Sequence, residues 1–276
     1  MELISAKKQV TAFLIFTAIL STVTYILYFT SVLTGGFIYL MWCPGIAALI
    51  TRLIYQKNLK NFGWGWGKTK YQALSYGLPL VLGLIVYGIV WLTGLGGTSI
   101  DNFTGFVASF LGLTESLSFL PSFFVLASVG LFFSIINAFG EEIGWRGLLV
   151  PELAKFTSFT NVSLISGAVW AIWHIPGILF VGYSSGLSPF FTIPCFVVMV
   201  ISASFVFAWI RLKSGSVWTA VILHATHNLF IQAFYDQMTV DTGSTYYFTT
   251  EFGIGMAVIY TIAAYYFWRK RGELSS

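Results

Sequence analysis

The feature that most constrains the fold of this chain is a series of long apolar runs. The first, VTAFLIFTAILSTVTYILYF at residues 10–29, has about the 20 residues that a helix needs to cross the hydrocarbon core of a bilayer. Hydrophobic residues make up 57% of the 276 residues and charged residues 9%, whereas soluble domains carry about 25% charged residues. The sequence therefore predicts an all-α polytopic membrane protein.

Hydropathy divides the chain into about eight transmembrane helices. We expect them near residues 10–33, 37–55, 71–93, 119–142, 160–181, 189–210, 216–235 and 252–268. The first run is too long for the core of a signal peptide and lacks an A-x-A cleavage site, so it is expected to be retained as a span. No soluble domain or repeat interrupts the series, which predicts a single integral membrane domain over residues 1–276.

The distribution of charge predicts how these helices are oriented. With the N-terminus in the cytoplasm, every lysine and arginine of the connections and termini falls on the cytoplasmic side. The charged residues of the outer loops are all acidic, namely Asp101, Glu115, Asp236, Asp241 and Glu251. The positive-inside rule is thus met by eight spans with both termini cytoplasmic. The net charge of +4 comes with no basic face, zinc finger or RNP-like motif, so the expected partner is the lipid bilayer and no nucleic acid is expected.

A few polar side chains lie inside the predicted spans, where an ionised group costs about 2.5–3.5 kcal/mol or more. Such groups usually face the interior of the bundle and mark a functional site. They are Glu141, Glu142 and Arg146 on the fourth span, His174 on the fifth, and His224, His227 and Asn228 on the seventh.

Helical spacing arranges these residues further. Glu142 and Arg146 are four residues apart and can form an ion pair, and His224 and Asn228 share one stripe for the same reason. Glu141 points about 100° away from Glu142. At about 1.5 Å per residue, the polar groups of the three spans reach the cytoplasmic half of the bilayer or its midplane. The sequence therefore predicts that they meet in one cavity.

These residue types suit the activation of water. A carboxylate in an apolar cavity can act as a general base, and a histidine can share that task or protonate a leaving amine. His224 and Asn228 could donate hydrogen bonds to a developing oxyanion. One glutamate and two histidines could equally supply three ligands to a catalytic zinc ion. The residues require no cofactor, and they leave a zinc ion open.

Each of these features also has a purely structural interpretation. The Glu142–Arg146 pair could simply clamp two helices together. His227 is best explained as a histidine that hydrogen-bonds a serine or a backbone carbonyl, and Trp170 as part of the core. A purely structural interpretation would need a separate explanation for each of Glu141, His174 and His224.

Three ordered motifs give the chain a family resemblance. EEIGWR at 141–146 fits E-E-x-x-x-R, WAIWH at 170–174 fits an aromatic-x-x-x-H pattern, and HATHN at 224–228 fits H-x-x-x-N. In this order the sequence resembles the CPBP family of CAAX proteases and bacteriocin-processing peptidases, also called Abi, which are intramembrane endopeptidases. Trp170 stands where the family usually has phenylalanine. The match predicts a catalytic core over about residues 120–235.

The resemblance implies a role for each matching residue. It implies that Glu141 and His174 activate the attacking water, and that His224 and Asn228 form the oxyanion pocket. It implies further that Glu142 and Arg146 support the site. Whether a zinc ion takes part stays open, with a metal-free mechanism favoured.

Other functions remain as alternatives at this stage. A non-catalytic immunity or scaffold protein of the membrane would use the same residues for binding, and a proton-coupled transporter would use them as a relay. Other intramembrane protease sites are not indicated, because H-E-x-x-H and G-x-G-D are absent and GYSSG at 182–186 falls in a predicted outer loop.

The substrate could be a prenylated C-terminus, a peptide pheromone or a bacteriocin leader. The short loops resemble those of bacterial relatives, which suggests a bacterial cell membrane and a role in peptide processing or bacteriocin self-immunity.

Overall fold

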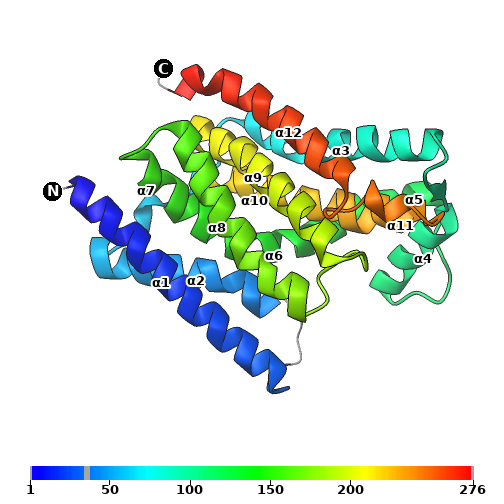
Figure 1. The fold of residues 1–276 in the computed structure, drawn as a ribbon, viewed down its shortest axis with the longest axis horizontal. Helices are drawn as coiled ribbons and strands as arrows, with labels where there is room; N and C mark the ends of the chain where they lie inside the picture. Colours follow the sequence, from blue (N-terminus) through cyan, green and yellow to red (C-terminus); the bar gives the residue numbers. More distant parts are fainter. Residues whose placement is uncertain (1, 34–37, 275–276) are drawn as a thin grey trace.

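The computed structural model describes residues 2–33 and 38–274, which form a bundle of helices (Figure 1). The prediction of an all-α fold is confirmed. The long helices are α1 (Glu2–Phe29), α2 (Ile38–Gln56), α3 (Thr69–Leu92), α6 (Leu131–Glu142), α8 (Phe159–Phe180), α9 (Pro189–Ser214), α10 (Val217–His227) and α12 (Ile254–Arg269).

Shorter elements join and extend these helices. Three of them are π-helical and continue a neighbouring α-helix: η2 (Leu126–Gly130), η3 (Ile143–Leu149) and η4 (Asn228–Tyr235). The other helical pieces are η1 (Lys60–Phe62), α4 (Ile100–Leu111), α5 (Phe119–Val125), α7 (Val150–Ala154), α11 (Asp236–Met238), η5 (Thr245–Tyr247) and η6 (Lys270–Leu274). The strands of the described residues, β1 (Gly97–Thr98) and β2 (Thr239–Val240), pair antiparallel and tie α4 to the end of α11.

Six helices of the described chain are long and apolar enough to cross a membrane. They are Leu3–Phe29, Ile38–Gln56, Thr69–Leu92, Phe119–Ala154, Phe159–Phe180 and Pro189–Ser214. The positions predicted for the last two spans are occupied by α10 with η4, where the helix changes from α to π at Asn228, and by α12, which has 16 residues. The protein is therefore an integral multi-pass membrane protein, and the count of eight spans stays a prediction.

The arrangement of the helix ends agrees with an even number of crossings. Figure 1 shows the start of α1 and the end of α12 on the same side of the bundle. The cytoplasmic location of that side remains a prediction from the charges.

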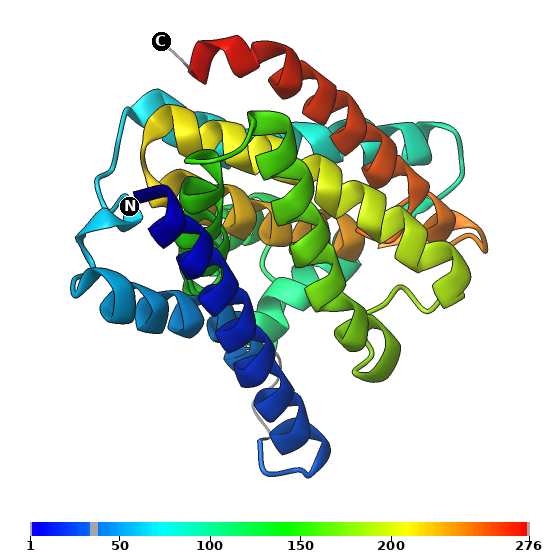
Figure 2. The same ribbon diagram turned by 60° about the vertical axis from the view of Figure 1, so that its left-hand side comes forward.

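The first helix lies at the edge of the bundle, with one face left uncovered. Ile15, Ile19, Val23 and Ile26 are each about half exposed and recur along that face. Figure 2 shows α1, in blue, crossing the front of the other helices and extending beyond them. An exposed stripe of this composition is what lipid contact requires of a membrane helix.

Helix α10, in contrast, lies at the centre of the bundle. It packs against α3, α6 and α9, and all of its residues except Trp218 are buried. Because its neighbours shield it from lipid, α10 can carry two histidines at low cost.

Glycines bring α2 very close to the helix that carries the first motif. A Cβ atom on Gly140 would lie 2.8 Å from the carbonyl oxygen of Met41, and one on Gly144 would lie 2.6 Å from Pro44. Such contacts between backbones are typical of small residues at membrane helix interfaces. The close packing fixes the chain on both sides of Glu141, in α6 and in η3.

Buried arginines hold the end of this segment. Arg211 of α9 donates to the backbone carbonyl of Arg146 at 2.8 Å and to that of Phe62 at 3.1 Å. Arg52 of α2 forms a buried ion pair with Glu152, with 3.0 Å between Nη1 and Oε1. Arg211 thereby anchors the π-helical turn that contains Arg146 to α9 and to η1, and Arg52 ties α2 to α7, the helix that follows this turn.

Candidate active site

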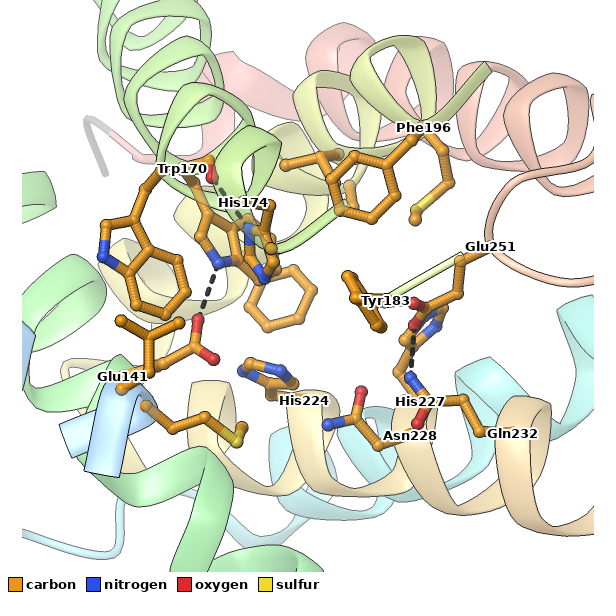
Figure 3. Close-up of a pocket in the computed structure, with 18 of the residues that line it drawn as sticks. Glu141, Trp170, His174, Tyr183, Phe196, His224, His227, Asn228, Gln232 and Glu251 are labelled. Carbon is orange, nitrogen blue, oxygen red and sulfur yellow. Dashed lines mark hydrogen bonds and ion pairs between the residues drawn. The ribbon is translucent and has the colours of Figure 1, made fainter. Parts of the chain in front are cut away.

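One cavity of about 230 Å³ lies between α6, α8, α9, α10 and η4. Glu141, His174, His224 and Asn228 all line it, so the structure brings together the four residues expected to be catalytic. Figure 3 shows them around one open space, with the Glu141 carboxylate between Trp170 and His224.

The Glu141 carboxylate is held on one side only. Its Oε2 accepts hydrogen bonds from the indole N–H of Trp170 at 2.8 Å and from that of Trp145 at 3.2 Å. Its Oε1 has no hydrogen-bond partner among the described residues. The side chain is 1% exposed, so the free oxygen can interact only with what occupies the cavity.

The orientation of His174 follows from its contact with its own helix. Its Nδ1 lies 2.8 Å from the backbone oxygen of Trp170. A carbonyl oxygen only accepts, so Nδ1 carries a hydrogen and a neutral ring has its lone pair on Nε2. The ring packs among aromatic side chains, with centroids 4.8 Å from Trp173, 5.2 Å from Phe196 and 5.8 Å from Tyr183.

His224 is bound to the second glutamate of the first motif. Its Nδ1 lies 2.9 Å from Oε1 of Glu142, which also accepts from Arg146 at 2.8 Å. The Arg146 guanidinium lies between two rings, 4.2 Å from the centroids of both Trp170 and Phe207. The predicted Glu142–Arg146 pair therefore forms, and it reaches the cavity through His224.

Asn228 differs from these residues because its side chain has no partner. In residues 2–33 and 38–274 no hydrogen bond is made by its amide group, which faces the cavity. Asn228 is also the first residue of the π-helix η4. π-Helical turns are rare and occur frequently at functional sites.

The structure corrects the interpretation of His227. We expected a bond to a serine or a backbone carbonyl, but Nε2 lies 2.7 Å from Oε1 of Glu251 and Nδ1 lies 2.7 Å from the hydroxyl of Tyr260. Both His227 and Glu251 line the cavity. The segment predicted as the last outer loop folds inward, so Glu251 is 4% exposed.

The sequence prediction therefore missed three contributors to the site. Trp145 is four residues from Glu141, and this spacing was a signal that the two side chains could meet. Trp170 was identified only as an aromatic position, although its N–H is the closest donor to Glu141. Glu251 gave no local signal, because its partner His227 lies 24 residues away.

The side chains expected as zinc ligands are not grouped as a metal site. Within the part of the chain that the structure describes, no three His, Cys, Asp or Glu side chains are placed so that they could hold one metal ion. The contacts of Glu141 Oε2, His174 Nδ1 and His224 Nδ1 leave Glu141 Oε1 and both Nε2 atoms unused by the described residues. The metal-free mechanism therefore stays a prediction.

A buried carboxylate, two imidazoles and an amide around one cavity within a membrane bundle are typical of a hydrolase that acts inside the membrane. Residues 122–230 match the model of a family described as type II CAAX prenyl endopeptidase Rce1-like. The chain is also 27% identical over 240 residues to CAAX prenyl protease 2 of Methanococcus maripaludis. This match covers 75% of this chain and 79% of that protein. These comparisons support the resemblance that the three motifs indicated, over residues 122–230, and they indicate a membrane peptidase.

Proposed function

We propose that the protein hydrolyses a peptide bond with a water molecule activated by Glu141 and His174. The observation that carries the proposal is the asymmetry of the Glu141 carboxylate. Two indole donors hold Oε2, while Oε1 is left without a partner in the described chain and faces a cavity shared with His174 and His224. A general base needs a fixed carboxylate with one oxygen available to a water molecule.

In the first step the water oxygen forms a bond to the carbonyl carbon of the substrate. The water proton passes to Glu141, and His174 Nε2 accepts the second hydrogen bond of the same water. The carbonyl π electrons move to oxygen and give a tetrahedral oxyanion. His174 is oriented for this role because its Nδ1 is used by the backbone of Trp170.

His224 and Asn228 then stabilise the oxyanion. The Asn228 amide supplies a donor that no protein group uses within the described residues. His224 donates through Nδ1 to Glu142, and protonation at Nε2 gives a second donor towards the cavity. The loss of one such donor in other hydrolases costs about 2.7–4 kcal/mol of barrier. Glu142 and Arg146 position His224 and do not touch the substrate.

In the last step the proton held by Glu141 passes to the leaving nitrogen, and the carbon–nitrogen bond breaks. The products are a carboxylic acid and an amine, so the water has been consumed and the side chains return to their starting state. No step requires a metal ion.

The substrate class that we propose is a lipid-modified peptide of the CAAX type. The opposite wall of the cavity is apolar and consists of α9 side chains, including Phe196, Met199 and Phe207. The matching family and the relative from Methanococcus maripaludis are both described as prenyl peptidases. No observation favours the bacteriocin, immunity or transporter alternatives. The catalytic core over residues 120–235 and the bacterial origin remain predictions from the sequence.

The test is cleavage of a farnesylated CAAX peptide with a fluorophore and a quencher, by the purified protein in proteoliposomes. We expect cleavage by the wild type and a loss of about 100- to 10,000-fold in Glu141→Gln and His174→Ala, because each removes a group that takes part in general acid–base catalysis. Glu115→Gln, which makes the same change at an exposed position in a predicted outer loop, should keep full activity. Full activity in both site variants would refute the proposal.

Chelation separates the two mechanisms that the sequence left open. We expect protein from which zinc has been removed, as measured by elemental analysis, to cleave the same peptide at an unchanged rate. A loss of cleavage that zinc restores would show that the site binds a metal ion despite its donor arrangement.

A further inference from the structure

The polar side of the cavity extends beyond the residues used in the proposed mechanism. His224, Asn228 and Gln232 follow one another at intervals of four residues along α10 and η4, and all three line the cavity. Figure 3 shows Asn228 and Gln232 on the same side of the open space, with Glu251 beyond them. Gln232 has no role in the steps described above.

The Gln232 amide is held in one orientation. Its Nε2 donates to Oε1 of Glu251 at 2.9 Å. A carboxylate only accepts, so the nitrogen must be the atom that faces Glu251. The amide oxygen is therefore the atom left over, and it has no partner within residues 2–33 and 38–274.

Glu251 is in turn fixed by other groups. Oε1 also accepts from His227 at 2.7 Å, and Oε2 accepts from the hydroxyl of Tyr183. Burial alone would raise the pKa of Glu251, but hydrogen bonds from His227, Tyr183 and Gln232 lower it overall. Because both of its oxygens accept from these groups, Glu251 keeps the Gln232 amide from turning over.

A peptide in this cavity needs partners for its backbone. An unpaired backbone N–H in an apolar site costs several kcal/mol by transfer scales, and the α9 wall offers no acceptor in Phe196 or Met199. The free oxygen of Gln232 is an acceptor of the right type. Gln232 lies four residues beyond Asn228 on η4, and its side chain lines the part of the cavity next to the proposed oxyanion pocket.

Resting on the proposed function, we infer that Gln232 accepts a hydrogen bond from a substrate backbone N–H within two residues of the scissile bond. Glu251, held by His227, is a positioning residue that keeps the acceptor turned towards the substrate. The protein therefore recognises an extended main chain at a fixed distance from the cleavage point, independently of side-chain identity there.

The test is an ester scan of the farnesylated CAAX reporter. Each backbone amide within two residues of the scissile bond is replaced in turn by an ester, which removes one N–H and keeps the shape of the chain. In the wild type we expect one position at which the ester lowers kcat/KM by about 3- to 10-fold, the usual range for a single hydrogen bond. In Gln232→Leu the amide peptide should lose a similar factor, and the ester at that position should cost nothing more.

Two further variants complete the experiment. Gln56→Leu makes the same change at the end of α2, outside the cavity, and should keep the ester effect. Glu251→Gln should reduce the effect at the same position, because the Gln232 amide is no longer oriented. If Gln232→Leu does not fold, as judged by size-exclusion chromatography, Gln232→Met, which is closer in shape, replaces it.

The inference is overturned if no ester lowers the rate in the wild type, or if the Gln232 variant stays as sensitive as the wild type. Failure of the proposed function looks different, because the unmodified amide peptide would then not be cleaved at all by the wild type. That result removes this inference as well.

Discussion

At the scale of single residues, the site depends on how one carboxylate is oriented inside a membrane protein. Glu141 is almost fully buried, yet its nearest donors are neutral indole groups from Trp170 and Trp145. Neutral donors fix the carboxylate without forming an ion pair that would compete for its second oxygen. The tryptophan at position 170 is significant because phenylalanine, expected there from the family pattern, has no N–H.

Replacing Trp170 by phenylalanine therefore tests this role. The aromatic ring that covers Arg146 remains, but the hydrogen bond to Glu141 is lost. Hydrogen bonds to charged groups contribute about 1.5–3 kcal/mol, so kcat should fall by about 10-fold or more with little change in KM. Trp209→Phe, which removes a buried indole donor bound to the backbone of Lys270, is the matched control. An unchanged kcat in Trp170→Phe would show that the bond does not matter for the reaction.

The buried carboxylate of Asp236, outside the predicted spans, gives a test based on stability. Asp236 follows η4, and burial raises its pKa from 3.8 to about 7, although a hydrogen bond from Tyr87 opposes the shift. The folded state then binds this proton more tightly than the unfolded state, so stability falls as pH rises from about 4 to 7.

Asp236→Asn should remove this dependence. One pKa unit corresponds to about 1.4 kcal/mol, so the variant should gain at least about 1 kcal/mol over the wild type between about pH 4 and pH 8. Denaturant unfolding of both proteins in detergent at the two pH values measures the difference. An equal difference at both pH values would contradict the pKa shift.

At the scale of helices, the site lies where regular structure changes. Glu142 is the last residue of α6 before the π-helix η3, and Asn228 is the first residue of η4. Near the first of these junctions, Gly140 and Gly144 contact α2. These contacts determine how closely α2 and the segment that carries Glu141 approach each other. The geometry around Glu141 thus depends on backbone packing as much as on side-chain contacts.

Gly140→Ala tests the importance of this packing. A Cβ atom would lie 2.8 Å from the Met41 carbonyl oxygen, closer than packed atoms tolerate, so α2 and α6 must separate. Overpacking of this kind costs typically about 1–3 kcal/mol, and we expect a lower thermal midpoint together with reduced peptidase activity. Gly88→Ala, in α3, meets nothing within 4 Å and should leave both unchanged. Equal behaviour of the two variants would contradict the argument.

The sequence was sufficient to predict the helices and the residues that meet in the cavity, for a definite physical reason. Both follow from the cost of placing polar groups in lipid. A glutamate within a predicted span, such as Glu141, is therefore expected to face the interior of the bundle. The π-helical turns were not predictable, because η3 and η4 have no distinct composition. The His227–Glu251 contact was also missed, since it depends on how a loop folds back into the bundle.

At the scale of the whole molecule, the bundle places a polar cavity among helices whose outer faces are apolar. The central helix α10 supplies the polar side, and α9 supplies the apolar side. The basic connections and the two ends of the chain predict which side faces the cytoplasm, while the count of eight spans rests on α10 with η4 and on α12.

Labelling of single cysteines measures that topology. In a background lacking Cys43 and Cys195, one cysteine at a time replaces an exposed residue. The positions are Lys57, Lys155 and Arg271 on the predicted inner side, and Glu115 and Asp241 on the outer side. We expect a membrane-impermeant maleimide to label only the outer positions in intact cells. Labelling at positions 57 and 271 on opposite sides would rule out an even number of crossings between them.

The central claim is that acidic, imidazole and amide groups from three helices act on one water molecule. The most direct measurement is an experimental structure of the protein bound to a peptide whose scissile carbonyl is replaced by a phosphonate. The account predicts Glu141 and His174 within about 2.6–3.2 Å of one phosphonate oxygen, and Asn228 within the same reach of the other. A phosphonate bound away from Glu141, or a Glu141 side chain turned towards lipid, would contradict it.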